Sequence, residues 1–232
     1  MLRIINMGRV PYEEALEIQG QIQRQRIDGQ CDDTLLLLEH PSVLTKGVRT
    51  SEDHILLSEE ALMAKGVAIH ESNRGGDVTY FGPGQVVGYI IMNIDGKGRD
   101  IRRIVRTLEQ ITMNILKNEF NIEAHTEDKK YTGVFVDANK ITAVGLAVNH
   151  RVTMHGFAMN VNTDLSHFDW IVPCGLHDRG VTSIKKLTGQ SFDLERMKQL
   201  IQSEFKSLFH TDTYEIDRAR LMQSLGACDH ET

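Results

Sequence analysis

The feature that most constrains the fold is a continuous apolar run over Thr34–Glu39 (Thr-Leu-Leu-Leu-Leu-Glu), which ends at His40-Pro41. The run has the length of a single strand, and its four leucines do not alternate with polar residues. A strand with one face in water would alternate, so this pattern predicts a strand that is covered on both faces. The sheet around it is therefore expected to be flanked by helices.

Several segments have the pattern of helices. The strongest begins after Asp100, a good N-cap, and its apolar side chains fall on one stripe: Ile101, Ile104, Val105, Leu108, Ile111, Ile115 and Leu116. The others are a helix from Pro11 to about residue 27, a short helix over Ser58–Lys65 and a helix over Asp193–Leu208. Ser42–Asp53 is predicted to be a loop, and the tail beyond residue 213 is short and charged.

Further strands are predicted over residues 2–6, 67–71, 77–81 and 86–94. Three more, over residues 131–136, 141–148 and 151–161, form an antiparallel meander with turns at Asp137–Lys140 and Asn149-His150. No repeat and no linker interrupts the pattern. We therefore expect one domain over residues 1–232, with an α/β (α+β) fold in which a mixed β-sheet is flanked by helices.

Composition narrows the functional classes. The chain is 41% hydrophobic and 25% charged, and it contains no run of 18 apolar residues, so we expect no membrane span. The N-terminus lacks the apolar core of a signal peptide, which favours a cytoplasmic protein. The three cysteines, Cys31, Cys174 and Cys228, are odd in number and far apart, so we expect them to be reduced. A net charge of −6 argues against a general nucleic-acid binder.

The segment Arg74–Gln85 has the most unusual composition, with four glycines and a proline between Arg74 and Gly84. These residues predict tight turns around a short strand, and such turns bring backbone N–H groups close to a ligand. The glycine spacing matches neither a phosphate-binding loop of the Walker type nor a dinucleotide fingerprint. The segment is therefore a candidate ligand loop without a nucleotide signature.

Cys174 lies between Pro173 and Gly175, at the end of a short apolar run. Proline stops a strand, and glycine allows a sharp turn and a close approach by another molecule. The position suits a reactive thiol at a strand end, although a buried cysteine that packs as a small hydrophobic residue is the alternative.

A thiol becomes a nucleophile as its thiolate, which a nearby cation or histidine stabilises. Lys140, His155 and His177 are the candidate partners for Cys174, and nothing local decides among them. Lys140 could equally be an exposed hairpin lysine. The spacing Cys174-x-x-His177 supplies only one end of a zinc site, so we expect no metal.

Several segments together resemble the lipoyl(octanoyl) transferase family, also called lipoate-protein ligase B. They are Arg74–Gln85, Tyr131–Gly133, Lys140–Gly145, His155–Asn160, Phe168–Leu176 and Val181–Ser183. The matches follow the family's order, which makes them more specific together than any one alone. The resemblance implies the mixed α/β fold that biotin and lipoate protein ligases share.

The resemblance also implies an activity: transfer of an octanoyl group from octanoyl-acyl carrier protein to a lysine of a lipoyl domain, through a thioester on the enzyme and without a cofactor. The implied acceptors are the lipoyl domains of 2-oxoacid dehydrogenase E2 subunits and the glycine cleavage H protein. The family's cysteine falls on Cys174, and its acid/base lysine falls on Lys140. The implied acyl-pocket residues are Arg74, Gly75, Gly76, Asp77, Val78, Thr79, Tyr80, Phe81, Ala143, Val144, Gly145, Gly156, Phe157 and Ala158.

Two positions depart from the family pattern. Phe81 stands where the family usually has histidine, and Asp77 stands where it commonly has glutamine. A polar role at position 81 therefore does not carry over, although a phenylalanine could still line an acyl pocket. Two other functions remain open on the same resemblance: an ATP-dependent lipoate ligase, and a non-catalytic binder of acyl carrier proteins or lipoyl domains.

Overall fold

The structure, a computed structural model, describes residues 1–94, 100–127, 131–172 and 179–226. The larger sheet within these residues consists of β1 (Leu2–Arg9), β2 (Asp33–Glu39), β6 (Gln85–Ile91), β7 (His125–Thr126), β8 (Gly133–Val136), β9 (Asn139–Asn149), β10 (Val152–Asn160), β11 (Gly180–Val181) and β12 (Thr213–Glu215). Its order is β12-β1-β2-β6-β10-β9-β8-β7, and β11 pairs with β9 outside this path. The sheet is mixed, as the sequence predicts, because β12, β1 and β2 run parallel while the pairs from β2 to β7 are antiparallel.

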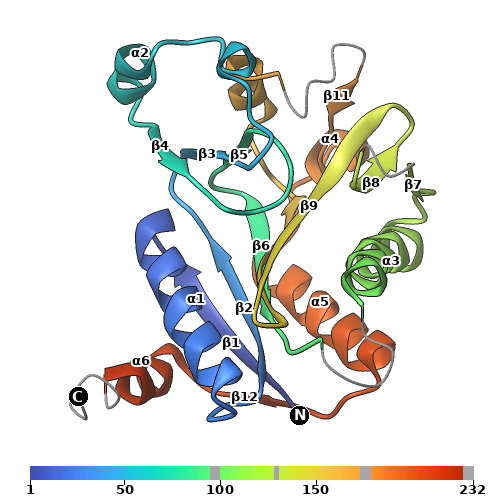
Figure 1. Cartoon of the computed structure of the whole chain (residues 1–232). Coiled ribbons are helices and arrows are strands. Elements are labelled where there is room, and N and C mark those ends of the chain that lie inside the picture. Colours follow the sequence, from blue (N-terminus) through green and yellow to red (C-terminus); the bar gives the residue numbers. More distant parts are fainter. Residues whose placement is uncertain (95–99, 128–130, 173–178, 227–232) are drawn as a thin grey trace.

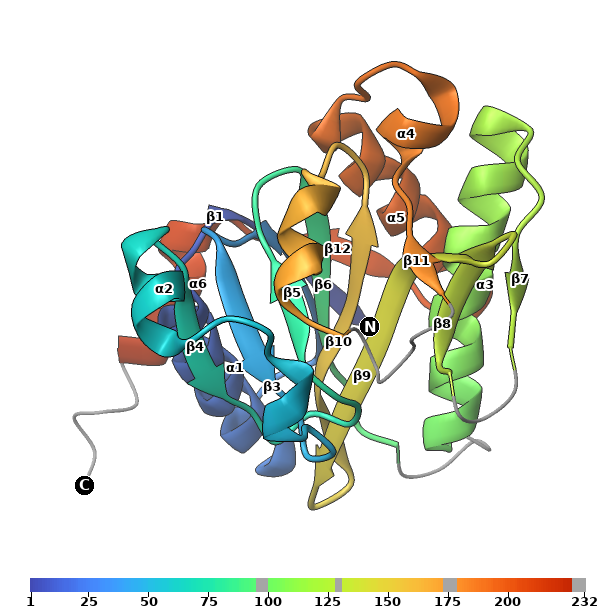
Figure 2. The same cartoon turned by 90° about the horizontal axis from the view of Figure 1, so that it is seen from above.

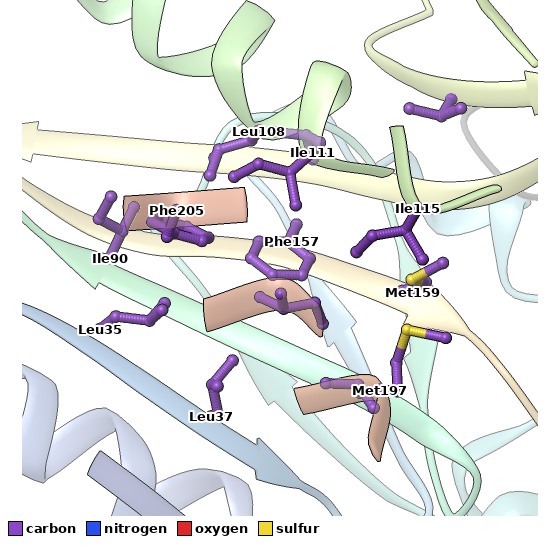
Figure 3. Close-up of a cluster of buried hydrophobic side chains, with 14 of the residues drawn as sticks. Leu35, Leu37, Ile90, Leu108, Ile111, Ile115, Phe157, Met159, Met197 and Phe205 are labelled. Atoms are coloured by element: carbon purple, nitrogen blue, oxygen red, sulfur yellow. The ribbon is translucent and has the colours of Figure 1, made fainter. Parts of the chain in front are cut away.

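Helices cover both faces of this sheet (Figure 1). They are α1 (Tyr12–Ile27), α3 (Ile101–Phe120), α4 (Ile184–Thr188), α5 (Leu194–Phe209) and α6 (Arg218–Gly226). On β2, Leu35 and Leu37 pack into a core with α3 and α5, which Figure 3 shows, while Leu36 and Leu38 pack into a second core with α1 and α6. The prediction of a strand covered on both faces is confirmed.

A smaller sheet, in the order β4-β3-β5, packs beside α1. It consists of β3 (Val43–Lys46), β4 (Ala68–Glu71) and β5 (Thr79–Phe81), and its neighbours are α2 (Glu59–Ala64) and the 3-10 helices η1 (Glu52–His54) and η2 (Leu165–Trp170). Figure 2 shows α2 and β4 on the side of the larger sheet away from α3 and α5. The prediction of a loop over Ser42–Asp53 is wrong, because β3 pairs with both β4 and β5.

The charged tail beyond Thr213, for which no helix or strand was predicted, is folded: β12 extends the sheet parallel to β1, and α6 buries Leu221 and Leu225. The hairpin turn predicted over Asp137–Lys140 is shorter, because β9 begins at Asn139 and its second residue, Lys140, already pairs with β8. The antiparallel meander itself is confirmed by the pairing of β8, β9 and β10. The strand end predicted at Cys174 lies outside the described residues.

The predicted helix after Asp100 is confirmed as α3, with both of the local signals that predicted it. Its N-cap, Asp100, accepts a hydrogen bond from the backbone N–H of Arg103 at 2.7 Å. The apolar stripe faces the sheet, with Ile104, Leu108 and Ile111 almost completely buried. This helix places its first turn and its buried face against the edge of the candidate site.

Candidate functional site

A cavity of about 190 Å³ lies where the segment after β4 crosses β9 and β10. Its walls come from the glycine-rich segment, from the middle of β9 and β10, and from the first turns of α1 and α3. The lining residues are Tyr12, Arg49, Arg74, Gly75, Gly76, Asp77, Val78, Thr79, Phe81, Tyr89, Ile101, Val105, Thr132, Lys140, Ala143, Val144, Gly145, Leu146, His155, Gly156, Phe157 and Ala158. Aliphatic and aromatic side chains make up much of the wall, which suits an apolar ligand.

All the predicted acyl-pocket residues except Tyr80 line this cavity. Tyr80 is buried on the other side of β5, where its hydroxyl lies 3.0 Å from Ser42 Oγ and 2.7 Å from His167 Nδ1. Adjacent residues of a strand face opposite ways, so Phe81 reaches the cavity and Tyr80 does not. Whether the lining residues bind an acyl chain stays a prediction.

The glycine-rich segment is fixed against the larger sheet by close backbone contact. The N–H of Gly75 donates to the carbonyl of Leu146 at 2.9 Å. A Cβ at Gly145 would lie 2.6 Å from the carbonyl oxygen of Gly75, so only glycine allows this approach. The tight packing of this segment is therefore against β9, and its predicted approach to a ligand stays a prediction.

Arg74 anchors the same segment to the smaller sheet. Its Nη2 donates to the carbonyl of Thr45 at 2.6 Å and to Thr45 Oγ1 at 2.9 Å. The side chain is only 7% exposed, and it also lines the cavity. Asp77 makes a comparable link: one carboxylate oxygen accepts from the N–H of Val78 at 2.6 Å, and the other lies 2.6 Å from Nδ1 of His54.

Lys140 is buried and faces the cavity. Its side chain lies over the ring of Phe135, with Nζ 5.1 Å from the ring centre, and Nζ donates to the carbonyl of Thr132 at 3.2 Å. The residue is only 7% exposed, so the alternative of an exposed hairpin lysine is wrong. Lys140 also lines a second, smaller cavity of about 30 Å³, whose wall includes Arg179.

Glu109 of α3 lies near Lys140, and both side chains bond to the Thr132–Gly133 peptide group. Glu109 was not identified from the sequence. Its carboxylate accepts from the N–H of Gly133 at 2.9 Å, and the side chain is 7% exposed. Burial raises the pKa of Glu109, while the Gly133 N–H and the charges of Arg106 and Lys140 lower it. The signal available in the sequence was a carboxylate next to Leu108 on an otherwise apolar stripe.

His155, a rival base in the sequence, lies far along the cavity wall from Lys140. It pairs with Leu146, six residues along β9 from Lys140, which is about 20 Å of strand. Burial, with the charge of Arg74, lowers the pKa of His155 to about 4, so the ring is neutral at pH 7. Its Nε2 lies 2.7 Å from Asn73 Oδ1, and among the described residues Nδ1 has no hydrogen-bond partner.

Tyr12, Phe81 and Tyr89 share the cavity wall with His155. The Phe81 and Tyr12 rings are stacked at 6.1 Å, and the Tyr89 ring meets His155 edge-on at 6.2 Å. The Tyr12 hydroxyl donates to Ser72 Oγ at 2.9 Å. Burial raises the pKa of Tyr89 well above its usual range, so its hydroxyl stays protonated. No pattern in the sequence brings Tyr12 and Tyr89 together, because α1 and β6 meet only in the folded chain.

Other candidate residues are not placed. Cys174 and His177 lie outside the described residues, so their relation to Lys140 stays a prediction. Within the described ranges, no three His, Cys, Asp or Glu side chains gather in a way that could hold a metal ion. The described helices are also too short or too polar for any of them to span a membrane.

The model of the lipoyl protein ligase A/B catalytic domain matches residues 11–206. An octanoyltransferase of Caldicellulosiruptor bescii is 50% identical over 208 residues, covering 90% of this chain and 91% of the relative. An octanoyltransferase of Caldicellulosiruptor saccharolyticus is 48% identical over 208 residues, covering 90% of this chain and 88% of the relative.

Among solved structures, a lipoate-protein ligase A bound with ATP is similar, with a TM-score of 0.76 and 16% sequence identity. The match covers 98% of this chain and 93% of that chain, and it supports the fold alone. The predicted lipoate ligase-like fold is thereby confirmed. With the family model and the two relatives, the chain belongs to the lipoyl(octanoyl) transferase family and is an acyltransferase.

Proposed function

We propose that the protein transfers an octanoyl group from octanoyl-acyl carrier protein to a specific lysine of a lipoyl domain, through a thioester on Cys174. The observation that carries the proposal is the buried Lys140 on the wall of a largely apolar cavity, which the glycine-rich segment Arg74–Gln85 also lines. The octanoyltransferase name of two close relatives supports the acyl group. The reaction takes place in the cytoplasm and needs no cofactor.

In the first half-reaction, the Cys174 thiolate attacks the carbonyl carbon of the donor thioester. A bond forms between that carbon and the Cys174 sulfur, and the bond to the carrier's sulfur breaks. The Lys140 ammonium gives a proton to the departing thiolate. Backbone N–H groups of the glycine-rich segment are candidates to stabilise the oxyanion that forms in between.

In the second half-reaction, the neutral amine of the acceptor lysine attacks the acyl-enzyme. A carbon–nitrogen bond forms, the bond to the Cys174 sulfur breaks, and Lys140 takes the proton that the amine releases. Lys140 thus ends in the protonation state in which it began. The acceptors are lipoyl domains, those of 2-oxoacid dehydrogenase E2 subunits and the glycine cleavage H protein.

Intact-protein mass spectrometry tests the proposal. The purified chain is mixed with octanoyl-carrier protein in the absence of ATP, alongside the Cys174→Ser and Lys140→Ala variants. We expect one octanoyl adduct on the wild type, which hydroxylamine removes and which Cys174→Ser lacks. A reaction that occurs only with free octanoate and ATP would replace the proposal by an ATP-dependent ligase. Carrier binding without any adduct would replace it by a non-catalytic binder.

A further inference from the structure

One peptide group connects Glu109 to Lys140. The carbonyl of Thr132 accepts a hydrogen bond from Lys140 Nζ at 3.2 Å. The N–H of the same peptide group, which belongs to Gly133, donates to the carboxylate of Glu109 at 2.9 Å. A carboxylate that accepts from the N–H polarises the peptide and makes its carbonyl a better acceptor, because hydrogen bonds in a chain strengthen one another. These two hydrogen bonds therefore connect the buried Glu109 carboxylate, through one peptide group, to the buried Lys140 ammonium.

The orientation of this peptide is unusual and depends on local constraints. Gly133 has φ of +135°, a conformation that only glycine adopts readily. A Cβ at this position would lie 2.3 Å from the carbonyl oxygen of Thr142. The backbone here also precedes a register shift between β8 and β9, at Val134/Phe135. Regular sheet pairing does not determine the direction of the Thr132 carbonyl. A hydrogen bond from outside the sheet is therefore needed to fix this peptide group.

Glu109 is suited to be that anchor. It is 7% exposed and lies on the sheet-facing side of α3, between buried Leu108 and Ile111. A buried carboxylate is costly unless it is hydrogen-bonded and faces positive charge. The charges that act on it are those of Arg106, on its own helix, and Lys140, on β9. A leucine at this position would leave the Gly133 N–H without its acceptor.

We propose that Glu109 is a positioning residue, which holds the Thr132–Gly133 peptide so that its carbonyl fixes the Lys140 ammonium at the cavity wall. The inference rests on the proposed function, because it assigns Lys140 a role in acyl transfer. Glu109 does not touch the substrate. Its effect reaches the reaction only through the peptide and Lys140.

The first test is kinetic and uses three variants. In Glu109→Ala the acceptor is gone, and we expect kcat for octanoyl transfer to fall about 100-fold with KM unchanged, since a catalytic group displaced by about 1 Å costs that much. Glu109→Gln keeps an acceptor oxygen at the same reach and should recover most of the loss. Glu109→Asp is one methylene shorter and should fall between them. Glu119→Gln, on the same helix and 4.0 Å from Arg196, is the matched control and should equal the wild type.

The second test does not depend on activity. The amide resonance of Gly133 in the full chain should move upfield in Glu109→Ala and stay near its wild-type position in Glu109→Gln. Acetic anhydride should label Lys140 faster in Glu109→Ala, with exposed Lys206 as the internal reference. These two measurements still judge the inference if the wild type forms no acyl adduct, in which case the proposed function fails separately.

The results that would overturn the inference are specific. A folded Glu109→Ala variant with wild-type kcat would do so, as would a Glu109→Gln variant that is as impaired as Glu109→Ala. If Glu109→Ala does not fold, Glu109→Asp and Glu109→Gln decide: equal kcat in these two variants contradicts positioning through the peptide. An unchanged Gly133 resonance in every variant would remove the structural basis of the proposal.

Discussion

The two ends of the cavity wall, around Lys140 and around His155, each bury a titratable side chain but surround it with different groups. Both side chains are buried, and both are titratable. Lys140 lies among the carbonyl of Thr132, the ring of Phe135 and the nearby Glu109 carboxylate. The His155 ring meets the Tyr89 ring edge-on with Arg74 nearby, and burial keeps it neutral at pH 7. The difference places hydrogen-bonding and charged groups around Lys140 and a neutral ring at His155.

Loss of Lys140 should have the largest effect on activity. We expect Lys140→Ala to lower kcat by about 1,000-fold, within the range that a general acid/base contributes. His155→Asn, at the other end of the wall, should keep kcat within about tenfold, because its neutral ring is far from the proposed proton transfer. Both are measured as octanoyl transfer at saturating donor. A His155 variant that loses as much activity as Lys140→Ala would reverse the assignment of the two ends.

Gly133→Ala should have the largest effect on stability. The added Cβ would meet the Thr142 carbonyl at 2.3 Å and would force an alanine into φ of +135°, so we expect a loss of about 3 kcal/mol in the free energy of unfolding. Chemical denaturation measures it. Gly226→Ala in α6, where no atom lies within 4 Å of the added Cβ, is the control and should change little. Wild-type stability in Gly133→Ala would mean that the peptide beside Lys140 is not constrained.

Some of these features could be predicted from the sequence, and others could not. Local signals are enough for α3, because Asp100 caps the helix and the apolar stripe repeats over it. They do not single out Lys140, which only the family resemblance distinguishes from His155 and His177. They could not find Glu109 as a partner, because it lies 31 positions before Lys140 in the sequence and a carboxylate on an apolar stripe has no motif. The short strand β3 was missed because its partners β4 and β5 are distant in sequence.

His155 should make stability depend on pH. Its pKa of about 4 in the folded state is lower than the ordinary value of 6.5. Between pH 4 and pH 6.5, the unfolded chain therefore protonates this histidine while the folded chain does not. Stability is therefore unaffected by His155 above pH 6.5 and falls as the pH drops toward 4, by about 1.4 kcal/mol per pH unit. In urea unfolding from pH 7 to pH 4, His155→Asn should lower the measured slope by this contribution. Asparagine tolerates the left-handed backbone of this position, where φ is +61°.

His40 should contribute a slope of the same sign, so a slope should remain in His155→Asn. Burial also lowers the pKa of His40 to about 4. Its ring lies 2.7 Å from the Tyr89 hydroxyl and 2.6 Å from the carbonyl of Val10, next to the aromatic end of the cavity. The double variant His155→Asn, His40→Asn should therefore lose about twice the slope of either single variant. Equal slopes in the single and double variants would show that the two histidines titrate as one unit.

The smallest effect is expected at Tyr80, which the family resemblance assigned to the acyl pocket but which faces away from the cavity. Its hydroxyl contacts Ser42 and His167, so Tyr80→Phe should lower the free energy of unfolding by about 1 kcal/mol, the usual worth of a hydrogen bond. Transfer activity and acyl-length preference should stay at the wild-type level. Phe81→Leu, one residue along β5, is the matched variant and should change chain-length preference, because Phe81 lines the cavity. If Tyr80→Phe altered length preference as well, the cavity wall would have to include both sides of β5.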